Sequence, residues 1–316
     1  MPRPALSVLA LASILPLTLS ACGLANGGGG ADADPKAPLT IMADSEPHST
    51  LLKQAEKLGL LGDVTIEVKE IAGDVDANQL VASGDVDANY FQHAPYLKNW
   101  NAEHSGNLQL VGLVHVEPLG LYSRKVHSVA ATPNGANIAI PADAVNQARA
   151  LFLLQQAGLL TLNVKADDPA LDYAQVTQKN IVENPKKLIF TTVDRPQLAA
   201  TLDDPKVTLS IVNGNYALEG GLVPSEDALV LDEVENNPYA NGLVTRPELV
   251  NDPRVRKVAQ ALADPQIARF ITTTFKGSVL PATQPGTAAT PASPTSATDS
   301  AAGSATPTPA TGTARS

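Results

Sequence analysis

The sequence predicts an α/β protein with two lobes and a ligand cleft between them. Short β-rich runs alternate with helical patterns from Leu39 to Pro281, which is typical of parallel sheets covered by helices. The 316 residues are 44% hydrophobic and 17% charged, a globular composition. That length leaves room for about two domains of roughly 150 residues each. The chain also begins with an export signal, and two sheets in an exported protein suggest two lobes with a cleft between them.

The N-terminus carries this signal. Residues 1–21 combine Arg3 with the apolar run ALSVLALASILPLTL, which is too short for a spanning helix and is typical of a signal peptide. The run ends in LSAC, which has the form of a bacterial lipobox, and Cys22 is the only cysteine of the chain. We therefore expect Cys22 to be lipidated rather than paired in a disulfide. Residues 22–38 are rich in glycine and predict a flexible tether to the outer face of the cell membrane.

The first half of the folded region begins with a buried strand, LTIMA, from Leu39. Residues 47–60 predict a helix, because a proline stands at its start and apolar residues follow at helical spacing. VTIEVKEI from Val64 predicts the next strand. DVDANYF at 85–91 predicts a further strand, and APYLKNWNAEHS at 94–105 predicts the helix that follows it.

The second half repeats this alternation and ends in two helices. The expected strands are NIAIPA from Asn137, KLIFTTV from Lys187, VTLSIVNG from Val207 and ALVLDE from Ala228, and the expected helices are 146–158, 253–264 and 265–277. Residues 282–316 consist mainly of Ala, Thr, Pro, Ser and Gly. Such a composition cannot bury enough apolar surface to offset the entropy of ordering, so we expect a disordered tail.

Composition and motifs exclude several classes of function. The formal net charge is -10 and no basic cluster is visible, which argues against a nucleic-acid partner. The sequence has no G-x-x-x-x-G-K-[ST], H-E-x-x-H or G-x-S-x-G motif. We therefore expect a binding protein with no cofactor rather than an enzyme. The five histidines are scattered, a pattern that is more often structural than metal-binding, and no metal site is predicted.

Aromatic residues concentrate in one segment. Of the 12 Trp, Tyr and Phe residues, four lie between Asp85 and Trp100, with His93 among them. A core or a pocket would explain this concentration. Tyr90, Phe91, Gln92 and His93 fall at the C-terminal end of the expected strand, and Tyr96, in the first turn of the helix, could return toward the same space. Trp100 lies one turn further on, which favours the core.

Polar residues mark two further element ends. Arg149 lies one turn into the apolar helix 146–158, where the helix dipole disfavours a cation. It is expected to pair with an anion, either an internal Asp or Glu or the carboxylate of a ligand, helped by the free N–H groups of the same helix end. Asn213 and Asn215 directly follow the strand VTLSIV, where ligands of open α/β sheets bind. Alternatively they make the turn and cap the next helix.

Several runs carry a resemblance to a known family. DANYFQHAPYL, VHVEPLGLYS, NIAIPADAVNQARALFLLQ, IVENPKKLIF, VNGNYALEGG and KGSVLPA are similar to signature runs of the NlpA lipoproteins, in the same order. This resemblance implies a type II periplasmic-binding-protein fold with a hinge of two crossing strands, near 118–123 and 227–232. It places one lobe at 39–120 plus 230–281 and the other at 121–229. It also implies methionine as ligand, with an ABC permease and ATPase as partner chains.

The resemblance also implies roles for individual residues. Arg149 matches the arginine that holds the ligand carboxylate, and Asn213 and Asn241 match asparagines that contact the amino-acid backbone. Phe91, His93 and Tyr96 match the aromatic wall around the thioether.

Asp74 departs from the family pattern, because a tyrosine that covers the ligand side chain is usual there. The absence of this tyrosine removes an S–aromatic contact worth roughly 0.3–1.5 kcal/mol. A ligand with a polar or cationic end, or a short methionine peptide, is therefore an alternative. Two further alternatives are a metal-binding importer component that uses His48, His93 or His115, and a signalling or adhesion lipoprotein.

Overall fold

The computed structural model describes residues 36–71, 75–168, 170–233 and 238–282. The predicted signal peptide, Cys22, Asp74 and the predicted tail from Thr283 lie outside these residues. In the described part, no helix combines the length and the apolar character needed to span a bilayer.

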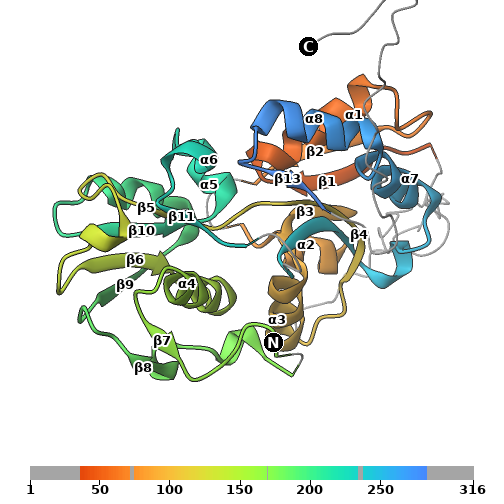
Figure 1. Cartoon of the computed structure of the whole chain (residues 1–316). Coiled ribbons are helices and arrows are strands. Elements are labelled where there is room, and N and C mark those ends of the chain that lie inside the picture. Colours follow the sequence, from red (N-terminus) through yellow and green to blue (C-terminus); the bar gives the residue numbers. More distant parts are fainter. Residues whose placement is uncertain (1–35, 72–74, 169, 234–237, 283–316) are drawn as a thin grey trace, which may run out of the picture. The chain divides into compact units, whose positions relative to one another are not determined.

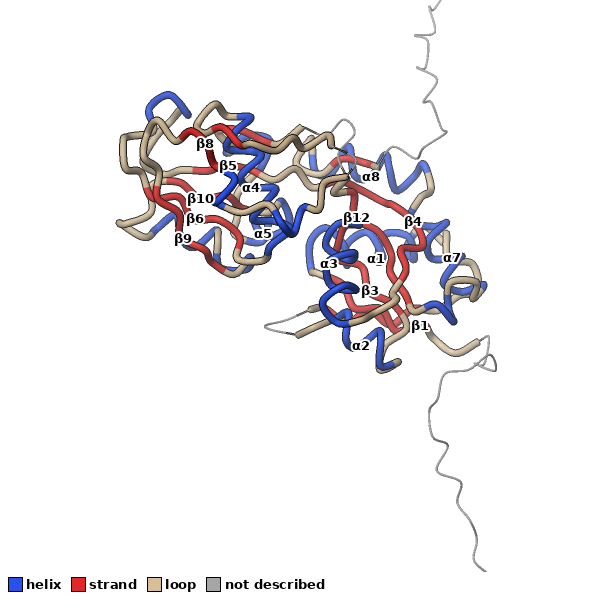
Figure 2. Tube along the Cα trace, turned by 90° about the horizontal axis from the view of Figure 1, so that it is seen from below, coloured by secondary structure: helices blue, strands red, loops and turns tan. Residues whose placement is uncertain are grey.

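Two mixed sheets organise the chain (Figures 1 and 2). The six-stranded sheet has the order β13-β4-β12-β3-β1-β2, and the five-stranded sheet has the order β11-β5-β10-β6-β9. Their strands are β1 Leu39–Ala43, β2 Ile66–Glu70, β3 Ala88–His93, β4 Gln109–Val116, β5 Gly120–Tyr122, β6 Asn137–Pro141, β9 Ile189–Val193, β10 Leu209–Val212, β11 Val230–Leu231, β12 Ala240–Thr245 and β13 Leu280–Pro281. A separate hairpin pairs β7 Thr161–Leu162 with β8 Ile181–Glu183. The predicted α/β class is confirmed.

The expectation of purely parallel sheets is wrong. The strands β2, β1 and β3 are parallel, but β12 pairs antiparallel with both β3 and β4. In the other sheet β9, β6 and β10 are parallel, and β5 and β11 join antiparallel. Residues 117–119, which connect β4 to β5, form no helix, so β5 enters its sheet without the helical connection that parallel neighbours require.

The helices are α1 Thr50–Lys57, α2 Ala77–Ser83, α3 Ala94–His104, α4 Ala144–Gln156, α5 Gly214–Glu219, α6 Pro224–Asp227, α7 Pro253–Leu262 and α8 Pro265–Phe275. Aspartates begin most of the longer ones. Asp76, Asp143, Asp252 and Asp264 each accept a backbone N–H of the first turn of the helix that follows. An N-cap of this kind contributes about 1 kcal/mol to helix stability. The cap at Asp143 starts α4 two residues before the predicted start.

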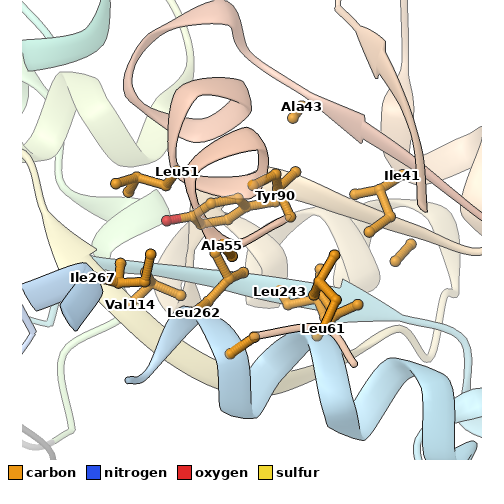
Figure 3. Packing of buried hydrophobic residues seen from close by; sticks show 14 of the residues in the cluster. Ile41, Ala43, Leu51, Ala55, Leu61, Tyr90, Val114, Leu243, Leu262 and Ile267 are labelled. Carbon is orange, nitrogen blue, oxygen red and sulfur yellow. The ribbon is translucent and has the colours of Figure 1, made fainter. Parts of the chain in front are cut away.

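Helices cover both faces of the six-stranded sheet. On one face α1, α7 and α8 pack with Tyr90 and Leu243, and Figure 3 shows these side chains gathered around the Tyr90 ring. On the other face α2 and α3 bury Val81 and Trp100. Trp100 is 7% exposed, so its predicted place in the core is confirmed.

The five-stranded sheet is likewise covered on both faces. Ile138 and Ile140 of β6 pack against α4, while Ala139 between them faces the cluster around Leu198 and Tyr122. This alternation follows from the two-residue period of a strand.

Two segments connect the sheets. The chain crosses between β4 and β5 at 117–119, and it returns between β11 and β12. Leu119 donates its N–H to the Asp232 carboxylate at 2.8 Å, and Asp232 donates its N–H to the Leu119 carbonyl at 2.9 Å. These contacts hold the two crossings side by side at the position expected for a hinge. The lobe limits expected from the sequence, 39–120 plus 230–281 and 121–229, stay a prediction.

Candidate ligand-binding site

Three segments meet where the two sheets face each other. His93 ends β3, Asn213 follows β10, and Asn146 lies in the first turn of α4. Asn213 Nδ2 donates to Asn146 Oδ1 at 2.9 Å, and His93 Nε2 lies 3.4 Å from the same oxygen. The Asn146 side-chain amide thus links the ends of β3 and β10, which are far apart in the sequence. The sequence analysis missed Asn146, although its position three residues after the capping Asp143 was a usable signal.

Asn213 contributes a second observation. Its Oδ1 is buried and has no hydrogen-bond partner among the residues that the structure describes. An unsatisfied buried acceptor costs about 1–3 kcal/mol, so a donor supplied from elsewhere would be bound favourably there. The side chain therefore offers an acceptor to the site. It makes no capping hydrogen bond to α5, although Asn213 stands at the N-cap position of that helix.

Arg149 is 3% exposed and holds two internal partners. Its Nε donates to Asp232 Oδ2 at 2.7 Å, and its Nη2 donates to the Glu117 carbonyl at 2.8 Å. The guanidinium also lies over the ring of Tyr239, 4.3 Å from the centroid. The internal salt bridge, one of the two expectations for Arg149, is therefore present. A ligand carboxylate at the same guanidinium stays a prediction.

Help from free N–H groups at this helix end stays a prediction. Because α4 begins at Ala144, Arg149 lies in the second turn, and the Asn146 N–H is bonded to Asp143 Oδ1 at 2.9 Å. The cap thus occupies one N–H group of the first turn.

The aromatic residues Phe91, His93 and Tyr96 are neighbours, as predicted. The Tyr96 ring meets Phe91 at 5.8 Å and His93 at 6.2 Å between centroids, both edge to face. His93 also meets Tyr239 at 5.0 Å. Burial, with the nearby charge of Arg149, lowers the pKa of His93 to about 3, so its imidazole is neutral. His93 Nδ1 accepts the Tyr96 N–H, which assigns the ring proton to Nε2 and directs it at Asn146.

Asn215 and Asn241 are both buried, but they lie in different surroundings. Asn215 Nδ2 donates to Asp44 Oδ2 at 2.9 Å, and its backbone N–H donates to Glu117 Oε2 at 3.0 Å. Asn241 lies on β12 in register with both His93 and His115. The structure thus brings Asn241 beside the strand end that carries His93, while Asn215 links Asp44 to the crossing segment.

His48, His115 and Glu117 form a fully buried group that could offer three metal ligands. His115 Nε2 lies 2.6 Å and His48 Nε2 lies 3.2 Å from Glu117 Oε1, and Tyr90 Oη lies 2.5 Å from His115 Nδ1. A contact of 2.6 Å is a charge-assisted hydrogen bond, shorter than the separation of two ligands about 2 Å from one ion.

The protonation of this group follows from its surroundings. Burial raises the pKa of Glu117, but His48, His115 and the Asn215 N–H lower it more, to about 2. Burial lowers the pKa of His48 to about 4. His48 is therefore neutral at pH 7, while Glu117 is an ionised carboxylate. His93, the third histidine of the metal alternative, lies with Tyr96 and Asn146 instead.

Two cavities adjoin these residues. One, of about 580 Å³, is lined by Arg149, Phe152, Tyr173 and Tyr239, among others. The other, of about 380 Å³, is lined by fifteen residues that include Phe91 and Tyr96. Asp74 lies outside the described residues, but Ile71 and Val75, on either side of that gap, both line the second cavity.

Residues 39–283 match the family described as NlpA lipoprotein. The chain belongs to the NlpA lipoprotein family. It is 33% identical to the methionine-binding lipoprotein MetQ of Bacillus subtilis, over 84% of this chain and 94% of that protein. The NlpA resemblance of the signature runs is thereby confirmed.

Solved structures of similar proteins support the same fold. A nutrient-binding protein from Burkholderia cenocepacia bound to methionine superposes with a TM-score of 0.72 at 34% identity, covering 78% of this chain and all of that chain. A periplasmic substrate-binding protein of an ABC transporter from Coxiella burnetii has a TM-score of 0.70 at 34% identity, covering 77% of this chain and all of that one. The expected type II periplasmic-binding-protein fold is confirmed by these structures.

Proposed function

We propose that the protein binds methionine or a close derivative without a chemical step and delivers it to an ABC importer. Cys22 carries the lipid that holds it at the extracytoplasmic face of the cell membrane. The permease and the ATPase are separate chains. Relatives of known name support this reading over a metal carrier, since one is a methionine-binding lipoprotein and one was solved with methionine.

The observation that carries the proposal is the buried Oδ1 of Asn213, which has no hydrogen-bond partner in the described part of the chain. An amino acid offers an ammonium group, which supplies the missing donor. Asn146, which holds the Asn213 amide, is three residues before Arg149 in α4, so both project from the same face of that helix. In this assignment the acceptor for an ammonium and the guanidinium for a carboxylate are both tied to α4, the first through Asn146 and the second as Arg149. In this assignment Asn241 completes the contacts to the amino-acid backbone.

The thioether lies against Phe91, His93 and Tyr96. Their edge-to-face packing presents apolar ring surface, and a neutral His93 adds no charge to it. Sulfur beside aromatic rings is favourable by roughly 0.3–1.5 kcal/mol. Closure of the two lobes removes water from the Arg149–carboxylate pair and strengthens it.

Calorimetric titration of the purified mature chain tests the proposal. We expect L- or D-methionine to bind, and Asn213→Ala to weaken that binding at least about tenfold, because the ammonium loses a charge-assisted hydrogen bond. Asn163→Ala, a change of the same type in the β7–β8 hairpin region, is the control and should bind like the parent. A parent protein that binds neither enantiomer would sink the proposal.

A further inference from the structure

The cavity of about 380 Å³ extends the proposed thioether wall. It shares Phe91 and Tyr96 with that wall and adds the rings of Trp100 and Tyr216. Its volume is in the range of small-molecule sites. The space therefore continues beyond the sulfur position, and its lining decides which ligand end it accepts.

Negative charge dominates this lining. Five carboxylates border the cavity, from Asp44, Asp76, Glu103, Asp143 and Asp194. The opposing cation is Arg195, whose Nε lies 3.4 Å from Asp143 Oδ2 and whose guanidinium lies over the ring of Tyr96 at 4.9 Å. That pair offsets one carboxylate. The remaining excess of negative charge, beside four rings, is the environment that binds organic cations.

Asp44 is the most buried of the five carboxylates, at 4% exposure. Its Oδ2 accepts Asn215 Nδ2, a neutral donor. Burial raises the pKa of Asp44 to about 7, against the lowering effect of Arg195, and Glu117 and Glu219 add to the rise. A carboxylate that has lost water without gaining a full counter-charge is stabilised by a cation in the cavity.

We infer that this cavity selects a ligand with a positive charge at the end remote from its carboxylate. The inference rests on the proposed function and deepens it. With the carboxylate at Arg149 and the sulfur at Phe91 and Tyr96, the charge would fall in the cavity beside Asp44. A thioether amino acid alkylated to a sulfonium has this form. A short peptide that ends in methionine is a second source of positive charge: its ammonium lies on the preceding residue, attached through the methionine nitrogen and not beyond the sulfur.

Titration of the mature chain with four ligands tests this inference. S-methyl-L-methionine carries the sulfonium, and L-ethionine is a neutral ligand with the same added carbon. L-methionine reports the proposed function itself, and alanyl-methionine tests the peptide source. We expect at least one cationic ligand, the sulfonium or the peptide, to bind about tenfold more tightly than ethionine.

Three variants locate the effect. Asp44→Asn should reduce the preference for the cationic ligand to about twofold or less. Asp63→Asn changes the net charge equally at an exposed position outside the cavity and should leave the preference intact. Tyr216→Leu removes one ring, keeps Asp44 and should lower the preference, which covers the case in which Asp44→Asn fails to fold.

The outcomes separate the two claims. If methionine and ethionine bind but neither cationic ligand binds more tightly, the inference is overturned and the proposed function stands. A preference that survives both Asp44→Asn and Tyr216→Leu overturns it as well. If no thioether ligand binds the parent, the proposed function fails and this inference fails with it.

Discussion

The carboxylate of Glu117 accepts the backbone N–H of Asn215 at 3.0 Å through Oε2, while Oε1 lies 2.6 Å from His115 Nε2. Glu117 directly follows β4 of the six-stranded sheet, and Asn215 lies in α5 after β10 of the five-stranded sheet. One buried charge therefore fixes the Asn213–Asn215 turn relative to the other sheet. The sequence placed Asn213 and Asn215 at a strand end, and Glu117 determines where that end lies.

Glu117→Gln should destabilise the protein by about 2–4 kcal/mol. The change keeps the shape of the side chain but removes its charge. It can also place an amide N–H against the His115 N–H in a buried hydrogen-bond network, where water cannot compensate. Urea unfolding followed by circular dichroism measures the difference. Glu219→Gln, at an exposed position at the end of α5, is the control. Equal unfolding midpoints for the parent and Glu117→Gln would show that the network contributes nothing.

Arg149→Ala should weaken methionine binding by about 3 kcal/mol, more than a hundredfold, because closure buries the ligand carboxylate without its partner. Asp232→Asn should leave binding equal or tighter, since it frees the guanidinium from its internal anion. Calorimetry on both variants measures this. If Arg149→Ala binds like the parent, the arginine is only the internal salt bridge and the proposed site is misplaced.

Asp44 should make the unliganded protein less stable as the pH rises. Its folded pKa of about 7 exceeds the ordinary value of 3.8. Between pH 3.8 and pH 7 the folded state therefore still binds a proton that the unfolded state has already released. Stability therefore falls with rising pH in that window, by up to about 1.4 kcal/mol per unit, and stays reduced above pH 7.

Asp44→Asn should remove this dependence. We expect Asp44→Asn to melt at a higher temperature than the parent at pH 8. At pH 4, where Asp44 is protonated in the folded state, we expect no difference in melting temperature. Thermal unfolding across pH 4–8 measures it, with Asp63→Asn as the matched exposed control. A parallel pH profile for Asp44→Asn and the parent would contradict the assignment.

Gly242→Ala should prevent stable folding or cost at least about 3 kcal/mol. A Cβ at Gly242 would overlap the Gly112 carbonyl oxygen on the neighbouring strand, and backbone on a paired strand cannot move aside. Gly112→Ala is the matched control, because its Cβ would meet Ala259 Cβ at an ordinary 3.6 Å. Melting temperatures of the two variants measure the difference, and equal values would contradict the packing described.

Cys22→Ser should leave the protein unprocessed or released from the membrane. The reason is chemical, since LSAC supplies the only thiol of the chain for a lipid. Fractionation of cells that express the variant, followed by immunoblotting, measures it. Ser20→Thr, which keeps the cysteine, is the control. Unchanged membrane attachment of Cys22→Ser would rule out the anchor.

Local patterns predicted the elements well, and the aromatic segment shows why. Phe91, His93 and Tyr96 are close in sequence, so the end of β3 and the first turn of α3 suffice to bring them together. Asn146 and Glu117 were missed, because each acts on residues far along the chain. Asn146 contacts a residue 67 positions away, and Glu117 contacts one 98 positions away.

The sequence by itself determined the α/β alternation, the start of most helices at a capping aspartate or a proline, and the family. These depend on propensity, period and local hydrogen bonds, which act within a few residues. The tertiary structure decided that strands from distant segments join each sheet antiparallel. It also decided that Arg149 is paired with Asp232 and that Asp44 lies buried beside four rings. Burial and long-range pairing set these, because desolvation and charge depend on neighbours that only the folded chain supplies.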